Sequence, residues 1–170
     1  MTPEAFFGGL WTHYVAMAPT ALKVRELLMA RGERVVNDHV AFRTFNLAPI
    51  DLSALAAPFL SWGYRQTGGY VFPTKRLVAR SYSHPSGNLP RVFLSELVTE
   101  AFSESLQETA QELVGALEPS TDPIARLLEG RTWPPLTHAR WEALRSESEY
   151  AAWLAAFGLC ANHFTVSVNA

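Results

Sequence analysis

The spacing of hydrophobic positions changes along this chain, and the changes divide it into helical and strand-forming parts. Residues 3–31 carry apolar side chains at helical spacing. They predict two helices, because Pro19 can open the second and Gly32 can end it. Residues 1–35 are therefore interpreted as an N-terminal helical region. We expect the leucines of its second helix to face inward, namely Leu22, Leu27 and Leu28.

The next part alternates apolar and polar residues, as strands do. Residues 39–45 predict a first strand, and a helix is predicted over 51–62. Further strands are predicted around residues 64–67, 76–84 and 91–97. The loops between these strands are short and rich in Gly, Pro and Asn, including a predicted Gly68-Gly69 turn, which favours antiparallel hairpins. Residues 36–98 thus read as a βαβββ module.

Residues 99–158 return to helical spacing, and Thr137 and Ser148 are each placed to cap a helix. We interpret this stretch as a helical insertion between two strand-rich parts. Residues 159–170 then open a second module and hold only its first strand. The predicted fold class is α+β, with N-terminal helices, a βαβββ module, a helical insertion and the first strand of an incomplete second module.

Two segments share one pattern, in which a His opens an alternating strand just after an Asn or Asp. Because strand side chains alternate, His39 shares a face with Arg43. The face of His163 also holds Thr165, Ser167 and Asn169. This polar face lies opposite a Phe/Val face and predicts that His163 lines a cavity. Neighbouring strands would bring two imidazoles together as transition-metal ligands, whereas a hydrogen-bonded structural His is the simpler interpretation of each.

Arg43 lies inside an otherwise apolar strand, four residues after His39. A buried Arg is rare unless it pairs with a carboxylate or phosphate of the protein or of a ligand. Four strand residues span about 13 Å between Cα atoms. A metal at His39 and the guanidinium of Arg43 could therefore hold the two ends of a small dicarboxylic acid. Thr165 and Ser167 are candidate substrate contacts on the second strand.

An Fe(II) site commonly adds one carboxylate to two His ligands. Glu96 is the one attractive acid on a predicted strand and is a candidate third ligand. Its alternatives are a solvated strand end or a salt-bridge partner of Arg43. Asp38 adjoins His39, so strict alternation points it to the other face, as a turn or supporting residue.

Composition narrows the function classes. A chain of 170 residues that is 48% hydrophobic and 18% charged suits one globular domain. The net charge of −2 and scattered basic residues argue against a nucleic-acid surface. We expect no membrane span and no signal peptide, because no apolar stretch is long enough and the N-terminus has no basic start. With Cys160 as the single cysteine, a cytoplasmic location fits the chain.

Three segments, residues 38–45, 93–97 and 162–165, read DHVAFRTF, FLSEL and NHFT. Together they resemble the 2-oxoadipate dioxygenase/decarboxylase family, which is related in fold to the vicinal oxygen chelate (glyoxalase/bleomycin-resistance) superfamily. The resemblance implies Fe(II) held by two His and one Glu, chelated by the 2-oxo acid, with an Arg on the distal carboxylate. His39 and His163 match the metal ligands, and Arg43 matches the Arg. The implied reaction uses O2 to convert 2-oxoadipate to 2-hydroxyglutarate and CO2 in lysine degradation.

One departure from the family affects the expected activity. The family's Glu ligand lies in the second module, after the second His, and nothing in this sequence matches it. We therefore expect a chain that lacks the C-terminal half. It is a fragment, a truncated gene product, or a half that a homodimer partner or a second polypeptide completes. Two alternatives stay open. The chain could be a non-catalytic glyoxalase-like module that binds a small molecule or metal, or it could use another divalent metal, such as Zn²⁺ or Ni²⁺, for isomerisation or hydrolysis.

Overall fold

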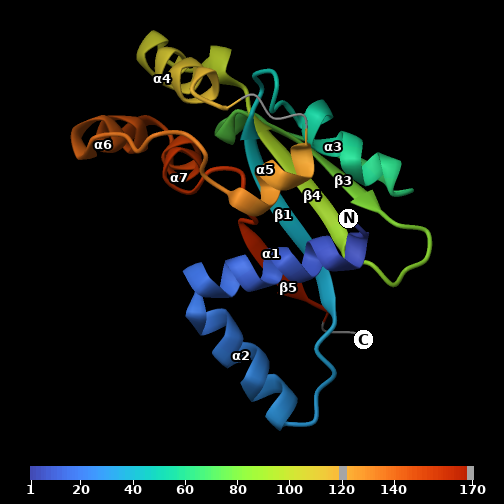
Figure 1. Ribbon diagram of the computed structural model, residues 1–170. Helices are drawn as coiled ribbons and strands as arrows, with labels where there is room; N and C mark the ends of the chain where they lie inside the picture. The colour runs from blue at the N-terminus through green and yellow to red at the C-terminus, as the bar shows by residue number, and fades with distance from the viewer. Residues whose placement is uncertain (119–121, 168–170) are drawn as a thin grey trace.

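The computed structural model describes residues 1–118 and 122–167, and a mixed sheet of five strands forms the centre of this part of the chain (Figure 1). The strands lie side by side in the order β2-β3-β4-β1-β5. Their bounds are Asn37–Phe45 (β1), Arg65–Phe72 (β2), Leu77–Ser83 (β3), Arg91–Leu97 (β4) and His163–Val166 (β5). β1 and β4 run parallel, and the other neighbouring pairs are antiparallel. Asn169, expected on the polar face of the last strand, lies outside the described residues.

Helices and two short 3-10 turns make up most of the remaining described chain. The helices are α1 (Pro3–Met17), α2 (Pro19–Ala30), α3 (Leu52–Ser61), α4 (Glu104–Gly115), α5 (Pro123–Glu129), α6 (His138–Glu147) and α7 (Glu149–Phe157). The 3-10 turns are η1 (Pro73–Lys75) and η2 (Thr99–Ala101). The run β1-α3-β2-β3-β4 confirms the predicted βαβββ order, and β4 has the bounds that the sequence predicts.

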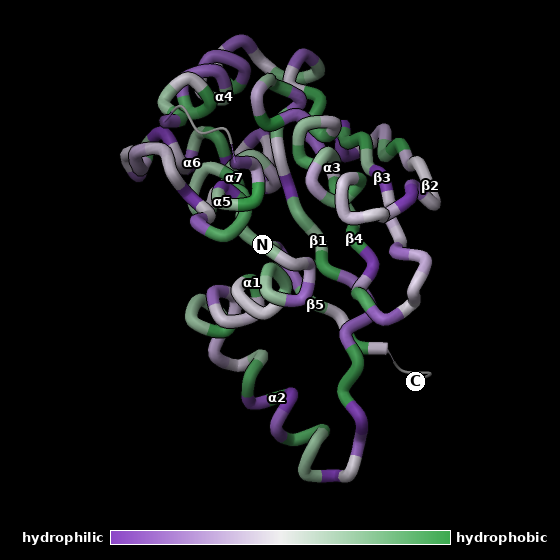
Figure 2. The backbone as a smooth tube through the Cα atoms, turned by 45° about the vertical axis from the view of Figure 1, so that its right-hand side comes forward, coloured by the Kyte–Doolittle hydropathy of each residue, from purple (hydrophilic) through white to green (hydrophobic). Residues whose placement is uncertain are grey.

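The core lies on one face of the sheet. Val40 and Phe42 of β1 point to this face and are fully buried. Helix α3 covers them with Phe59, whose ring centroid lies 6.0 Å from that of Phe42, and α1 adds Phe6 at 5.8 Å from Phe59. Figure 2 shows the hydrophobic colouring along β1 and β4. Burying each such side chain contributes roughly 1.5–3 kcal/mol, so this face anchors the sheet.

The opposite face of the sheet receives α7 from the helical insertion. Thr137 and Ser148 cap α6 and α7, as predicted. The Tyr150 hydroxyl of α7 reaches the sheet, where it donates to the carbonyl of Ser95 at 2.6 Å and accepts from the amide of Thr44 at 3.1 Å. The insertion is thereby fixed to the two parallel strands, on the face away from α3.

The predicted Gly68-Gly69 turn is wrong, because both glycines lie inside β2. The pairing of β2 with β3 shifts register just before Gly68. A Cβ at Gly68 would lie 2.5 Å from the Tyr70 hydroxyl oxygen and 2.8 Å from Ser81 Oγ. Glycine therefore serves a close approach within the sheet. The chain reverses direction at η1 instead.

The inward orientation expected for the leucines of α2 is also wrong for Leu22 and Leu27, whereas Leu28 is partly buried. Helix α2 has no buried residue, and Leu22 and Leu27 are 40% and 65% exposed. It extends away from the sheet beside α1 (Figure 1). The reason is that the apolar side chains of α2 lie on more than one side of the helix, and they form no single stripe that a neighbour could cover.

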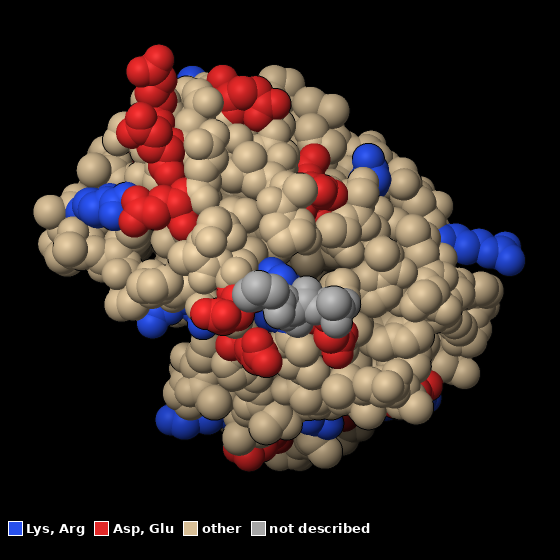
Figure 3. Space-filling model, turned by 45° about the horizontal axis from the view of Figure 1, so that its top comes forward, with Lys and Arg blue, Asp and Glu red and all other residues tan. Residues whose placement is uncertain are grey.

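Acidic and basic side chains are interspersed on the face that Figure 3 shows, which carries no extended basic patch. Across residues 1–118 and 122–167, no helix combines the length and apolar character needed to cross a membrane.

Candidate metal and substrate site

A β-bulge at the start of β1 brings Asp38 beside His39. Between Asn37 and Val40, two residues of β1 oppose a single residue of β5, Thr165. A bulge of this kind suspends the strict alternation of side chains. Asp38 consequently does not point to the opposite face, as alternation predicts. Its Oδ2 lies 2.8 Å from Nδ1 of His39.

The two imidazoles that the sequence predicts to meet lie side by side. The ring centroids of His39 and His163 are 5.5 Å apart. Nδ1 of His39 lies 2.8 Å from both Asp38 Oδ2 and Thr165 Oγ1, and Nδ1 of His163 lies 2.9 Å from Asn162 Oδ1. With both Nδ1 atoms engaged, each ring keeps Nε2 for a ligand. A His whose second nitrogen donates to a carboxylate or amide oxygen is typical of metal sites.

Two groups at the paired rings have shifted pKa values, namely the Asp38 carboxyl and the His163 imidazole. The hydrogen bond to His39 and then the contact with Arg91 hold the pKa of Asp38 below its usual value. Nη2 of Arg91 lies 2.6 and 2.7 Å from the two carboxylate oxygens. Asp38 is therefore ionised, so the proton resides on Nδ1 of His39. Burial chiefly lowers the pKa of His163, with smaller effects from His39 and Arg43. A neutral imidazole is the form that binds a metal.

Arg43 lies on the same face of β1 as His39 and contacts two aromatic rings of α7. Its Cζ is 4.9 Å from the ring centroids of both Tyr150 and Trp153. Within the described residues, no carboxylate lies within ion-pair distance of this guanidinium. Burial lowers the pKa of Arg43, yet an Arg remains charged at neutral pH. A charged group in this setting can bind an anion, and a carboxylate fits its planar fork.

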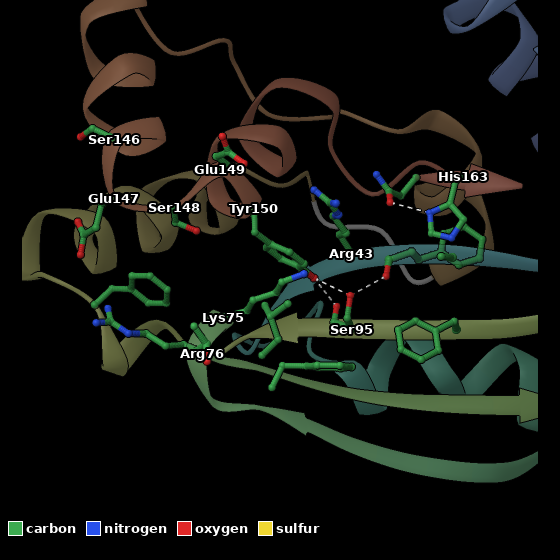
Figure 4. A pocket seen from close by; sticks show the side chains of 18 residues that line it. Arg43, Lys75, Arg76, Ser95, Ser146, Glu147, Ser148, Glu149, Tyr150 and His163 are labelled. Atoms are coloured by element: carbon green, nitrogen blue, oxygen red, sulfur yellow. Dashed lines mark hydrogen bonds between the residues drawn. The ribbon is translucent and has the colours of Figure 1, made fainter. Parts of the chain in front are cut away.

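Arg43 and His163 line one cavity of about 880 Å³ between the sheet and α7 (Figure 4). Figure 4 places Arg43 between the Tyr150 side and the His163 side of this space. Its wall also includes Ala41, Phe93, Ser95, Lys75 and Glu147. His39 adjoins the cavity through the ring of His163. The volume suits a small ligand, and the lining combines apolar residues with a few polar groups.

The structure does not place Glu96 with the two His. The parallel register pairs Arg43 with Ser95 and Thr44 with Glu96, so Glu96 points to the core face. Its Oε2 accepts a hydrogen bond from the amide of Leu52 at the start of α3, at 2.8 Å. The sheet therefore separates Glu96 from His39 and from Arg43, and its placement beside either is wrong. Among residues 1–118 and 122–167, no three His, Cys, Asp or Glu side chains are grouped to hold a metal.

Thr165 and Ser167 are absent from the lining of the cavity that holds Arg43. Thr165 Oγ1 instead accepts a hydrogen bond from the amide of His39 at 3.1 Å and contacts its Nδ1. The amide of Ser167 donates to the carbonyl of Val36 at 2.9 Å. Thr165 thus supports His39, and substrate contact by Thr165 and Ser167 stays a prediction.

Sequence reasoning missed four residues of this site, and a usable signal existed for one. Asn162 precedes His163 as Asp38 precedes His39, and both preceding side chains contact the following ring. Arg91, Tyr150 and Trp153 carry no local signal, because only the fold brings them to the site.

The chain is similar to proteins of known family. Residues 17–170 match the family model of 2-oxoadipate dioxygenase/decarboxylase. A chloroplastic 2-oxoadipate dioxygenase/decarboxylase of Arabidopsis thaliana is 34% identical over 185 residues, covering 98% of this chain and 50% of that protein. The crystal structure of hydroxyglutarate synthase from Oryza sativa in complex with 2-oxoadipate has a TM-score of 0.86 and 30% identity, covering 96% of this chain and 56% of that one.

Two further structures concern the fold. A Shewanella frigidimarina protein, named provisionally as a hydrolase, has a TM-score of 0.89 and 43% identity, covering 98% of this chain and 65% of that one. A Ralstonia eutropha protein assigned to the glyoxalase superfamily is 24% identical with a TM-score of 0.85, covering 96% of this chain and 61% of that one, and shows the expected glyoxalase-like fold. The chain spans about half the length of the curated relatives it matches. By this match over residues 17–170, the chain belongs to the 2-oxoadipate dioxygenase/decarboxylase family.

Proposed function

We propose that this chain binds Fe(II) and a 2-oxo dicarboxylic acid, 2-oxoadipate, for an O2-dependent decarboxylation to 2-hydroxyglutarate and CO2. One observation carries the proposal. Two imidazoles with engaged Nδ1 atoms and an Arg without a carboxylate partner among the described residues meet at one face of the sheet. The name of the Arabidopsis relative and the 2-oxoadipate complex of the Oryza protein support the choice of substrate.

The residues present fit a divalent transition metal, although they supply only part of a ligand set. His39 and His163 would hold the metal through Nε2, because Asp38 and Asn162 engage their other nitrogens. Fe(II) bound by two imidazoles and one carboxylate supplies the O2 chemistry that this reaction needs. A carboxylate outside the described residues would complete the set.

The protein's own part is to bind and orient the substrate. Arg43 would bind the distal carboxylate. It lines the same cavity as His163, and its contacts with the rings of Tyr150 and Trp153 hold its guanidinium there. The two oxo-acid oxygens at the other end would then face the His pair. The reaction balances with one O2 for each substrate molecule. The carboxylate next to the keto group leaves as CO2 with its own two oxygens, one O2 atom enters the new carboxylate at the former keto carbon, and the other becomes the new hydroxyl.

The metal-binding step can be tested on this chain. Under argon, Fe(II) affinity is measured for wild type, His39→Ala, His163→Ala and the control His138→Ala, whose side chain is 86% exposed. We expect each of the first two substitutions to weaken binding by at least about tenfold. His138→Ala should match wild type. Equal affinity of wild type and the His39→Ala/His163→Ala double variant would reject the metal site.

A binding module without turnover is the second candidate function. It is favoured by the absence of a three-residue ligand group among residues 1–118 and 122–167. The two functions differ when O2 is admitted to the complex with Fe(II) and 2-oxoadipate. O2 uptake matched by CO2 release supports the enzyme, whereas binding without O2 uptake supports the module.

A further inference from the structure

Arg43 is held by the sheet through its backbone and by helix α7 through its side chain. Its backbone belongs to β1, while its guanidinium contacts the rings of Tyr150 and Trp153, each 4.9 Å from Cζ. These two residues are three apart on α7, so they present their rings on one side of that helix. A cation over an aromatic face within about 6 Å is attracted to it, and more strongly where water is excluded.

The hydroxyl of Tyr150 fixes the position of α7 against the sheet directly beneath Arg43. It donates to the carbonyl of Ser95 at 2.6 Å and accepts from the amide of Thr44 at 3.1 Å. Ser95 is the register partner of Arg43, and its own hydroxyl donates to the carbonyl of Phe42 at 3.2 Å. The Tyr150 ring is therefore tied to β1, which carries Arg43, through Thr44 and to the neighbouring β4 through Ser95, which Figure 4 labels beside it.

We propose that Tyr150 and Trp153 fix the Arg43 guanidinium at a set distance from the His pair and so select the length of the dicarboxylic acid. An Arg side chain alone is long and flexible enough to follow shorter or longer ligands. Ring contacts on a helix tied to the sheet remove that freedom. His163 is paired with Ala41, only two residues from Arg43 along β1, so the span between the two ends is short and well defined.

The length selection should be measurable, because one methylene changes the reach of an extended acid by about 1.3 Å. A missing methylene typically costs about 10-fold or more where both ends are fixed. The inference rests on the proposed function for its substrate class. It goes further by assigning the positioning of Arg43 to two residues of the helical insertion.

The experiment compares calorimetric affinities for 2-oxoadipate and for 2-oxoglutarate, which is one methylene shorter, with Fe(II) under argon. The test variants are Trp153→Leu and Trp153→Phe. The matched control is Trp62→Leu, which removes a ring that contacts Phe6 and Phe59 in the core and does not line the cavity. Lys75→Gln neutralises a cavity cation on η1 that has no ring contact among the described residues.

Wild type should prefer 2-oxoadipate by about 10-fold or more. Trp153→Leu should weaken 2-oxoadipate binding by about threefold to tenfold and reduce the preference, whereas Trp153→Phe should restore most of it. Trp62→Leu and Lys75→Gln should keep the wild-type preference, even if Trp62→Leu lowers the melting temperature. An unchanged preference in Trp153→Leu, or its loss in Lys75→Gln, overturns the inference alone. If wild type binds neither acid, the proposed function fails first and the inference with it.

Discussion

The carboxylate of Asp38 provides the sharpest test of the metal site, because it acts on His39 without being a ligand. It accepts from Nδ1 of His39 at 2.8 Å and is held ionised by that bond and by Arg91. Asp38→Asn keeps the size and one acceptor oxygen but removes the negative charge that makes the ring a better donor to a metal. Losing such a supporting group costs about 10- to 100-fold in metal affinity.

We expect the low end of that range, about tenfold or roughly 1.4 kcal/mol, because Thr165 Oγ1 remains 2.8 Å from the same nitrogen. The matched control is Arg91→Gln. Its side chain is 58% exposed, so the ion pair with Asp38 contributes about 0–1 kcal/mol and metal affinity should change by less than about threefold.

The assay is a competition titration of Fe(II) against a chromophoric chelator at pH 7 under argon. Urea unfolding of the metal-free proteins shows whether either variant is destabilised. Wild-type affinity in Asp38→Asn, or an equal loss in both variants, would refute the role given to the carboxylate.

Two other substitutions test the structure away from the metal site. Glu96→Gln should leave Fe(II) affinity unchanged and lower the free energy of unfolding in urea by about 0.5–1 kcal/mol, since Glu96 accepts from the first turn of α3; a tenfold loss of Fe(II) affinity would contradict its placement on the core face. Glu147→Gln should destabilise the protein by less than about 1 kcal/mol at pH 7. Hydrogen bonds from Ser103 lower the pKa of Glu147 below its usual 4.5. Its stabilisation is therefore present above pH 4.5 and lost as pH falls further, so the two proteins should converge in denaturant titrations at acidic pH, and a constant gap would exclude this linkage.

The sequence predicted the elements of the central module well because the signals for strands, turns and helix caps lie within each element. Alternation and turn residues gave the strand at residues 91–97, and hydroxyl caps marked the starts of α6 and α7. The same reasoning failed at Gly68, where glycine serves a close contact across the sheet, and at α2, whose exposure depends on which neighbours cover it. Those outcomes depend on tertiary contacts that spacing does not contain.

The site shows the same division. Alternation correctly placed His39 and Arg43 on one face, and the repeated pattern pointed to His163 as its neighbour. Alternation within β4 could not say which of its faces meets Arg43, because that depends on the parallel register, and Glu96 proved to be on the other face. The contacts of Arg43 with Tyr150 join residues more than a hundred positions apart.

The bulge in β1 adds a residue that the pairing of the sheet does not require but that the proposed metal site uses. β1 has one more residue than β5 across this stretch, and the extra residue supplies the Asp38 carboxylate. A chain without Asp38 would pair evenly with β5, and His39 would keep its face. Deleting this single position would therefore preserve the architecture while removing the charge beside His39, the proposed metal ligand. The length of this stretch of β1 can therefore be compared among related sequences. Sequences with the extra residue can keep the supporting carboxylate, whereas those without it keep only the fold.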